Sequence, residues 1–177
     1  MGFSQLQPLR QAMRLAMLSS RMACLSGWSF EKPTQTLLWS DECCILHGHP
    51  PGHQPTLEEG ISHYTPECRE MIERAVQRCL IQGEPFDFEA ELVRLDGQRL
   101  WVRAIGERVC DAAGTITGFE GAVQDITVQH RQENERHAAA NKLSAALQSM
   151  SDAFFTLDRN WVITYANQEM SRLLGPT

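Results

Sequence analysis

The sequence predicts an α+β protein built around an antiparallel sheet. Two short turn sequences divide residues 83–127 into three consecutive strand patterns. A helical pattern with regularly spaced apolar residues precedes these strands, and a charged helical pattern follows them. Short turns join strands that run antiparallel, so the strands are expected to form one sheet, with the helices segregated from it.

Residues 1–24 are predicted to form an amphipathic helix. Pro8 places the regular part of this helix after about Leu9, because proline lacks the amide hydrogen that a helix interior needs. The apolar face comes close to a heptad seam and consists of Leu6, Leu9, Met13, Ala16, Met17 and Ser20. We expect the Leu6–Cys24 helix to pair with its copy in a homodimer. Packing of this helix on the sheet of its own chain is the alternative.

Two further helices are predicted between residues 56 and 83. Thr56 and Glu59 form a capping box that opens a short helix. Thr65 and Pro66 are an N-cap and N1 pair that opens a longer helix, which Gly83 ends. The buried face of the longer helix is predicted to consist of Ile72, Ala75, Val76, Cys79 and Leu80.

The three strands follow the longer helix. The first alternates acidic residues with an apolar face of Phe86, Phe88, Ala90 and Leu92. The pair Asp96-Gly97 predicts a type I′ turn with positive φ at both residues, so the strand Arg99–Cys110 must run back along the first. Residues 111–114 supply a second turn before a strand over residues 115–124.

Residues 130–151 are predicted to form a connector helix. The segment is charged and rich in Ala and Gln, with a weak heptad pattern. A weakly packed helix suits signal transmission, because a switch needs two packings that differ by only a few kcal/mol. Residues 152–177 then repeat the order strand, strand and short helix, which predicts the truncated start of a second domain.

Several of these motifs together resemble the PAS domain family, in its PAS/PAC sensory-box form. The C-terminal half carries Gly83-Glu84-Pro85, Asp96-Gly97, Leu100-Trp101-Val102-Arg103, Gly118 and Gln124-Asp125-Ile126-Thr127. The N-terminal half carries Gly27–Glu31 and Leu37–Glu42, similar to the first two strands of the family, and His63–Glu70, similar to the entry into its long helix. The resemblance covers residues 25–129. It implies a five-stranded antiparallel sheet with short helices and one long helix on one face, flanked by N- and C-terminal helices.

The resemblance also implies a function. We expect a sensory module of a larger bacterial-type signalling protein, such as a histidine kinase or a cyclic-di-GMP enzyme. Asp125, Ile126 and Thr127 would then relay the signal from the last strand to the connector helix and a downstream output domain. The alternative is a ligand-free interaction or dimerisation module. No P-loop, dinucleotide fingerprint, nucleophile elbow or zinc-protease motif occurs, so no enzyme activity is predicted for this segment.

Composition narrows the classes of partner and compartment. The net charge of −6 and a pI near 5.5 argue against a general nucleic-acid binder. Apolar stretches are too short to span a membrane, and Met1 opens no signal-peptide pattern, so we expect a cytoplasmic segment. The six cysteines lack paired Cys-x-x-Cys spacing, which predicts reduced, mostly structural thiols.

A ligand pocket is the main candidate site. Its predicted lining consists of three tryptophans and three strand glycines: Trp28, Trp39, Trp101, Gly106, Gly118 and Gly121. Some PAS domains bind FAD non-covalently in pockets of this kind, so FAD is a candidate cofactor. The alternative is that the tryptophans fill the core and the glycines mark bulges, curvature or a close approach. Haem is not predicted, because haem-binding PAS domains usually take their iron ligand from the long helix, and this helix lacks histidine here. Covalent FMN is not predicted, because the cysteine motif that attaches flavin in related light sensors is absent.

A second, weaker candidate is a metal site. His47, His49 and His53 follow Cys43 and Cys44 within a short stretch, and imidazole and thiolate are good ligands for zinc. The alternative places His47 and the cysteines on a short helix packed against the sheet, with His49 and His53 in the loop around Pro50-Pro51-Gly52. We predict no metal on this pattern alone.

Overall fold

The computed structural model describes residues 25–149 and 152–174. The chain divides into two compact units, Met1–Val128 and Gln129–Thr177. The helix predicted over Leu6–Cys24 lies outside the described residues. Of the helices in the described ranges, none is long and apolar enough to cross a membrane.

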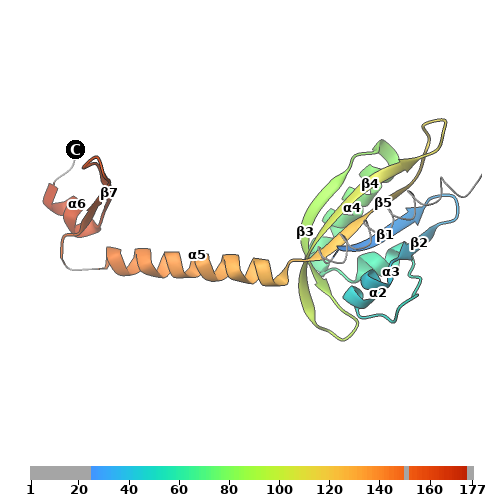
Figure 1. Cartoon of the computed structure of the whole chain (residues 1–177), viewed down its shortest axis with the longest axis horizontal. Coiled ribbons are helices and arrows are strands. Elements are labelled where there is room, and N and C mark those ends of the chain that lie inside the picture. The colour runs from blue at the N-terminus through green and yellow to red at the C-terminus, as the bar shows by residue number, and fades with distance from the viewer. Residues whose placement is uncertain (1–24, 150–151, 175–177) are drawn as a thin grey trace, which may run out of the picture. The chain divides into compact units, whose positions relative to one another are not determined.

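The first unit contains the predicted five-stranded antiparallel sheet (Figure 1). Its strands are β1 (Leu25–Glu31), β2 (Thr36–Trp39), β3 (Phe86–Val93), β4 (Arg99–Cys110) and β5 (Ile116–Asp125). The order across the sheet is β2-β1-β5-β4-β3, so the N-terminal hairpin lies beside the last strand. The predicted α+β fold class is confirmed.

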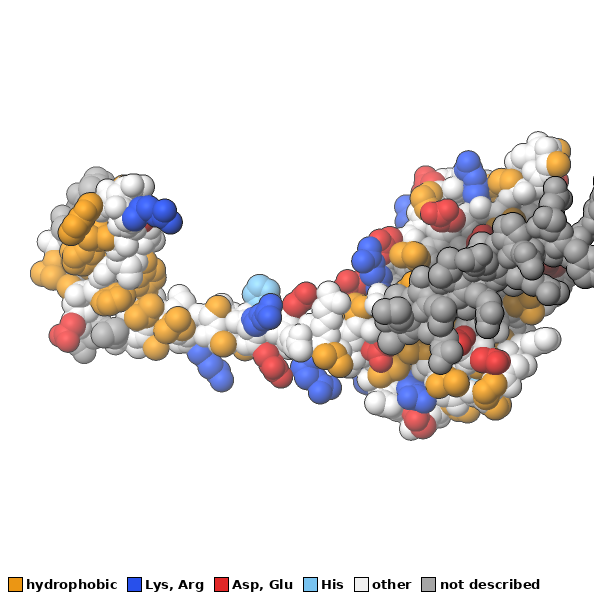
Figure 2. Space-filling view, in the orientation of Figure 1, with side chains coloured by type: hydrophobic (Ala, Val, Ile, Leu, Met, Phe, Trp, Pro, Cys, Tyr) orange, Lys and Arg blue, Asp and Glu red, His pale blue; other side chains and the backbone are white. Residues whose placement is uncertain are grey.

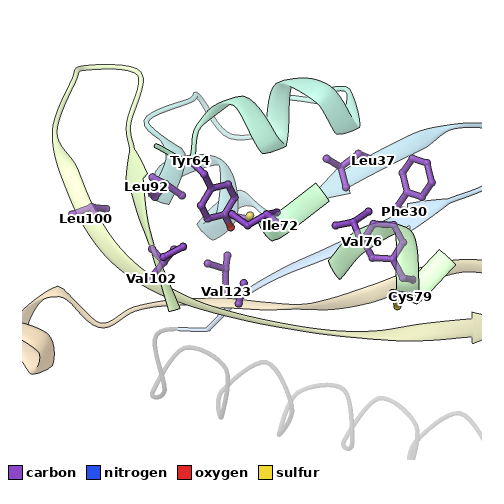
Figure 3. Packing of buried hydrophobic residues seen from close by; sticks show 14 residues of the cluster. Phe30, Leu37, Tyr64, Ile72, Val76, Cys79, Leu92, Leu100, Val102 and Val123 are labelled. Atoms are coloured by element: carbon purple, nitrogen blue, oxygen red, sulfur yellow. The ribbon is translucent and has the colours of Figure 1, made fainter. Parts of the chain in front are cut away.

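Three helices pack against one face of this sheet: α2 (Asp41–His47), α3 (Leu57–Ser62) and α4 (Pro66–Gln82). Ser40 caps α2 by accepting a hydrogen bond from the Cys43 N–H, and Thr56 caps α3 in the same way from the Glu59 N–H. The hydrophobic core lies between helices and sheet, as Figure 3 shows, with Ile72 and Val76 on α4 and Val102 and Val123 on the sheet.

The start of α4 differs from the prediction in one respect. Thr65 is the N-cap residue and Pro66 opens the helix, but the Thr65 side chain makes no capping hydrogen bond. The backbone of Thr65 instead donates to the Glu91 carbonyl, and the Val93 N–H donates to the His63 carbonyl. These bonds hold residues 63–65 along the outer edge of β3, so pairing with the strand fixes the entry to the helix.

The turn between β3 and β4 does not have the predicted type I′ geometry. Among the described non-glycine residues, only Gln35 and Trp161 have positive φ, so Asp96 does not. Arg94 pairs with Gln98, and the loop between them has Gly97 in the left-handed region at φ 84°. A glycine at the end of a longer loop is the other common hairpin solution. The Asp96 carboxylate accepts from the Gln98 N–H and stabilises it.

The second unit begins within α5 (Thr127–Gln148), which has no buried residue and carries charged side chains of both signs (Figure 2). The predicted hairpin and helix follow as β6 (Phe155–Leu157), β7 (Ile163–Ala166) and α6 (Gln168–Leu174). Asn167 is fully buried and joins them: its side-chain oxygen accepts from the N–H groups of Phe154 and Met170. The large apolar side chains exposed in this unit include Phe155, Leu157, Trp161, Val162, Ile163 and Leu173.

Candidate functional site

A cavity of about 70 Å³ lies between the helices and the inner face of the sheet of the first unit. Aromatic side chains form much of its wall, including Trp28, Trp39, Phe86 and Phe119. The volume is enough for a few water molecules or a very small ligand. It is well below the ~300–1,000 Å³ of typical ligand pockets, so a flavin ring would have to displace part of this wall.

One row of residues crosses the inner face of the sheet, and three of its members, Trp28, Trp39 and Phe86, line the cavity. Strand pairing aligns Phe86 with Gly106, Gly106 with Gly121, Gly121 with Trp28, and Trp28 with Trp39. The two glycines leave a gap in this row, and the rings of Trp28 and Phe86 stack across it at 5.9 Å, with 3° between their planes.

The spacing around the glycines shows which of the predicted explanations applies. A Cβ on Gly106 would lie 2.4 Å from the Phe86 ring and 2.8 Å from the Trp28 ring. A Cβ on Gly121 would meet the Ile105 carbonyl and the Trp28 ring, and one on Gly118 would meet the Phe30 carbonyl. In the five-stranded sheet the register shift lies between Val109 and Cys110, and Val109 pairs with Gly118. Close approach therefore explains Gly106 and Gly121, whereas Gly118 lies both against β1 and next to the register shift.

Trp101 is separated from the other two tryptophans. It lies on β4 between the buried Leu100 and Val102, so it occupies the opposite face of the sheet from the core. Its position on that face could not be read from the aromatic residue type alone. The predicted set therefore divides: Trp28, Trp39, Gly106 and Gly121 share one row, Gly118 lies against β1, and Trp101 lies on the outer face.

The polar groups of the cavity wall are neutral near pH 7. His47 is buried, stacks on Trp39 with ring centroids 4.0 Å apart, and donates from Nδ1 to the Cys43 carbonyl. Burial lowers the pKa of His47 to about 4, and the hydrogen bond to Cys43 opposes this shift only in part. Burial also raises the pKa of the Cys43 thiol and of the Tyr64 hydroxyl. The cavity therefore favours an uncharged ligand.

Asp125, Ile126 and Thr127 form the strand–helix junction at the end of β5. The Asp125 carboxylate accepts from the Thr127 N–H at 2.8 Å, at the first residue of α5. The Thr127 hydroxyl accepts from the Trp101 N–H at 3.0 Å, and the Ile126 N–H donates to the Trp101 carbonyl at 2.8 Å. Ile126 is buried. Ile126 and Thr127, at the start of α5, are thus hydrogen-bonded to the backbone of β4.

The histidines are arranged differently from the sequence cluster. His47 belongs to the cavity wall, whereas the rings of His49 and His53 stack at 4.0 Å outside it. Glu59 and His63, for which the sequence predicts other roles, lie next to these two histidines. Glu59, read as part of a capping box, lies 3.0 Å from His53 Nε2, and His63, read as part of a family motif, lies 3.0 Å from His49 Nε2.

Known protein families match two parts of the chain. Residues 36–123 match the family described as PAS fold, and residues 141–177 match the family described as PAS domain. The chain is 26% identical over 148 residues to the sensor protein FixL of Bradyrhizobium diazoefficiens. It is 23% identical over 168 residues to the probable diguanylate cyclase DgcE of Escherichia coli. These matches cover 84% and 95% of this chain but 29% and 15% of the relatives, so it spans less than a third of either.

Solved structures with a similar fold come from the same classes of protein. A sensory box histidine kinase/response regulator from Burkholderia thailandensis matches with a TM-score of 0.59 at 20% identity, over 72% of this chain and 95% of that one. The N-terminal domain of a diguanylate cyclase with PAS/PAC sensor from Marinobacter aquaeolei matches with a TM-score of 0.56 at 20% identity, over 60% of this chain and 98% of that one. The chain therefore belongs to the PAS domain family, with one PAS fold at residues 36–123 and a second PAS match at residues 141–177.

Proposed function

We propose that the first unit is a sensory module of a larger signalling protein, whose output domain is a histidine kinase or a cyclic-di-GMP enzyme. A small, uncharged ligand in the cavity would alter strand β4, and α5 would carry the change to the output domain. In this proposal the segment regulates and does not itself catalyse a reaction. The proposal includes a cytoplasmic location, because both classes of output domain use nucleotide substrates that are found in the cytoplasm.

The observation that carries this proposal is the connection between the cavity and α5. Ala104 of β4 lines the cavity, and Trp101 of the same strand is hydrogen-bonded through its backbone to Ile126 and Thr127. A shift of β4 that accommodates a ligand would therefore strain the bonds that hold the start of α5. Relatives named as a sensor protein and a probable diguanylate cyclase support the same class of function.

A ligand-free interaction module is the second candidate. The size of the cavity favours it, because about 70 Å³ is small for a metabolite and the stacked Trp28 and Phe86 rings already fill the row above the glycines. In this case the aromatic side chains stabilise the core, and the signal is a change of partner or of dimer packing.

Retention of a ligand distinguishes the two candidates. The chain is purified from a cofactor-replete host and measured by native mass spectrometry and by visible absorption, which also detects FAD. The sensor proposal expects a retained small molecule that is lost in Ala104→Leu, which fills the cavity, and kept in Ile105→Leu, which alters the exposed face of the same strand. Folding of both variants is checked by circular dichroism. A wild-type chain that never retains a molecule favours the interaction module.

Assembly is a further part of the proposal. We infer that the module works as a homodimer through the Leu6–Cys24 helix, because the apolar seam of that segment needs a partner surface to be buried. A dimer would bring two copies of α5, and of the output domain after it, under common control.

A further inference from the structure

Three side chains outside the cavity, those of His49, His53 and Glu59, offer donor atoms that converge on one place, and His63 contacts this group through His49. Nε2 of His53 lies 3.0 Å from the Glu59 Oε1 atom, and Nε2 of His49 lies 3.9 Å from the same oxygen. The donor atoms of these three residues all lie within 4.8 Å of one another. On the far side of His49, Nε2 of His63 approaches Nε2 of His49 to 3.0 Å.

The spacing agrees with a single tetrahedral ion. Zinc binds imidazole nitrogen and carboxylate oxygen at ~2.0–2.2 Å, so neighbouring ligand atoms in a tetrahedral site lie about 3.3 Å apart. The separations of 3.0 Å between His53 and Glu59 and of 3.9 Å between His49 and Glu59 lie around this value. We propose that the chain binds one divalent transition-metal ion of the zinc class through His49, His53 and Glu59, with His63 as the partner that holds His49 in place.

His63 is oriented toward His49. Its Nδ1 atom lies 3.0 Å from the Val93 carbonyl, which can only accept, so Nδ1 carries the hydrogen. In the neutral ring Nε2 then presents its lone pair toward His49. Partners that fix the orientation of a metal-bound histidine contribute to metal affinity.

The loop that carries His49 and His53 is held by several bonds. The His49 N–H donates to the Cys44 carbonyl at 2.8 Å, and the His53 N–H donates to the Pro50 carbonyl at 3.2 Å. Between them, the Gly52 N–H donates to the Asp41 carboxylate at 3.1 Å. Glu59 lies in the first turn of α3, and His63 is the C-cap residue of this helix. A rigid helix and a pinned loop thus supply the ligands, as a preorganised site requires.

Access differs among the ligands in a way that suits reversible binding. The His49 side chain is 8% exposed, whereas His53 and Glu59 are 28% and 37% exposed, so solvent reaches one side of the group. Trp39 lies beside the inner side, with its ring centroid 5.9 Å from that of His49 and 6.0 Å from that of His63. Because Trp39 also lines the cavity, the ion would lie behind one wall of the candidate ligand site.

Metal titration of the whole chain tests this proposal. The purified chain is stripped with a chelator, and Zn²⁺ is added in competition with a chromophoric chelator. One tight equivalent per chain is expected. The double variant His49→Ala/His63→Ala should weaken binding by at least about 100-fold, because even the outer partners of metal ligands are worth ~10–100-fold. The matched control is His130→Ala/His137→Ala, which removes two histidines of α5 and should leave the affinity unchanged.

X-ray absorption of the zinc-loaded wild-type chain keeps the test independent of variant folding. A shell of nitrogen and oxygen ligands with imidazole scattering is expected. A sulfur shell would assign the ion to cysteine thiols and overturn the proposal, as would equal Zn²⁺ affinity in the wild type and in a folded His49→Ala/His63→Ala variant.

Discussion

At the level of single residues, two paired glycines leave room for aromatic side chains that line the cavity. Gly106 and Gly121 face each other on β4 and β5, and Trp28 and Phe86 stack where their side chains would have been. Glycine ordinarily weakens a strand because it contributes no side-chain packing. Here the absence of a Cβ at these glycines permits the Trp28 and Phe86 rings to stack, so the glycines stabilise the sheet through the packing of their neighbours.

Gly106→Ala should therefore destabilise the first unit by ~1–3 kcal/mol, because the new methyl group overlaps the Phe86 and Trp28 rings. Urea unfolding followed by circular dichroism measures this change. Gly27→Ala on β1 is the matched control: its Cβ would meet nothing within 4 Å, and a change within ~0.5 kcal/mol is expected. Equal stability of the two variants would show that the rings move aside freely.

The candidate metal ligands show what residue patterns can and cannot reveal. His49 and His53 stood out in the sequence because they are close along the chain. Glu59 matched a helix-capping pattern, and its backbone N–H does bind Thr56, but its carboxylate lies against His53. His63 is brought in by the pairing of residues 63–65 with β3, whose partners lie about 30 residues away. Local patterns carry no information about such a contact.

At the level of elements, sequence patterns placed helices and strands well and their connections less well. Periodicity and caps gave the ends of α4 and the alternation of β3, because both depend on neighbouring residues. The β3–β4 turn was assigned the wrong type because Asp-Gly is compatible with more than one loop length. The face occupied by Trp101 follows from the strand register, and the aromatic residue type does not specify it.

The strand–helix junction yields a prediction at the same scale. Thr127→Val keeps the shape of the side chain but removes the hydroxyl that accepts from the Trp101 N–H. Loss of this bond should cost ~0.5–1.5 kcal/mol, which corresponds to roughly two- to tenfold faster exchange of the Trp101 amide where local opening controls exchange. Hydrogen exchange read by NMR measures it. In a protein that includes the output domain, activity should change more than the melting temperature does.

Two variants make this test specific. Thr127→Ser retains the hydroxyl and should behave like the wild type in both measurements. Thr115→Val makes the same chemical change in the exposed turn before β5 and should leave the junction untouched. If Thr127→Val leaves both amide exchange and output unaltered, the junction is not a relay.

At the level of the whole molecule, the order of elements could be predicted, whereas the arrangement of the strands needed the family resemblance. Periodicity identified β3, β4 and β5 as neighbours along the chain. The placement of β5 between β1 and β4 joins residues 25–31 to residues 118–124, a pairing that no local signal reports. The hairpin β1–β2 followed by the short helix α2 recurs as the hairpin β6–β7 followed by α6, which agrees with an internal repeat.

The proposed homodimer is a property of the whole chain, and it rests on the sequence of the Leu6–Cys24 segment. Two glutamates in the apolar seam should disrupt a paired helix, because a buried unpaired charge costs several kcal/mol. Met13→Glu/Met17→Glu is therefore expected to convert a dimer into a monomer while the sheet remains intact by circular dichroism. Gln7→Glu/Gln11→Glu adds the same charge outside the seam and should leave the dimer unchanged. Sedimentation velocity over a range of concentrations gives the mass of each species. A wild-type chain that sediments as a monomer at high concentration would exclude this helix as a dimer contact and leave its packing on the sheet of its own chain as the explanation of the seam.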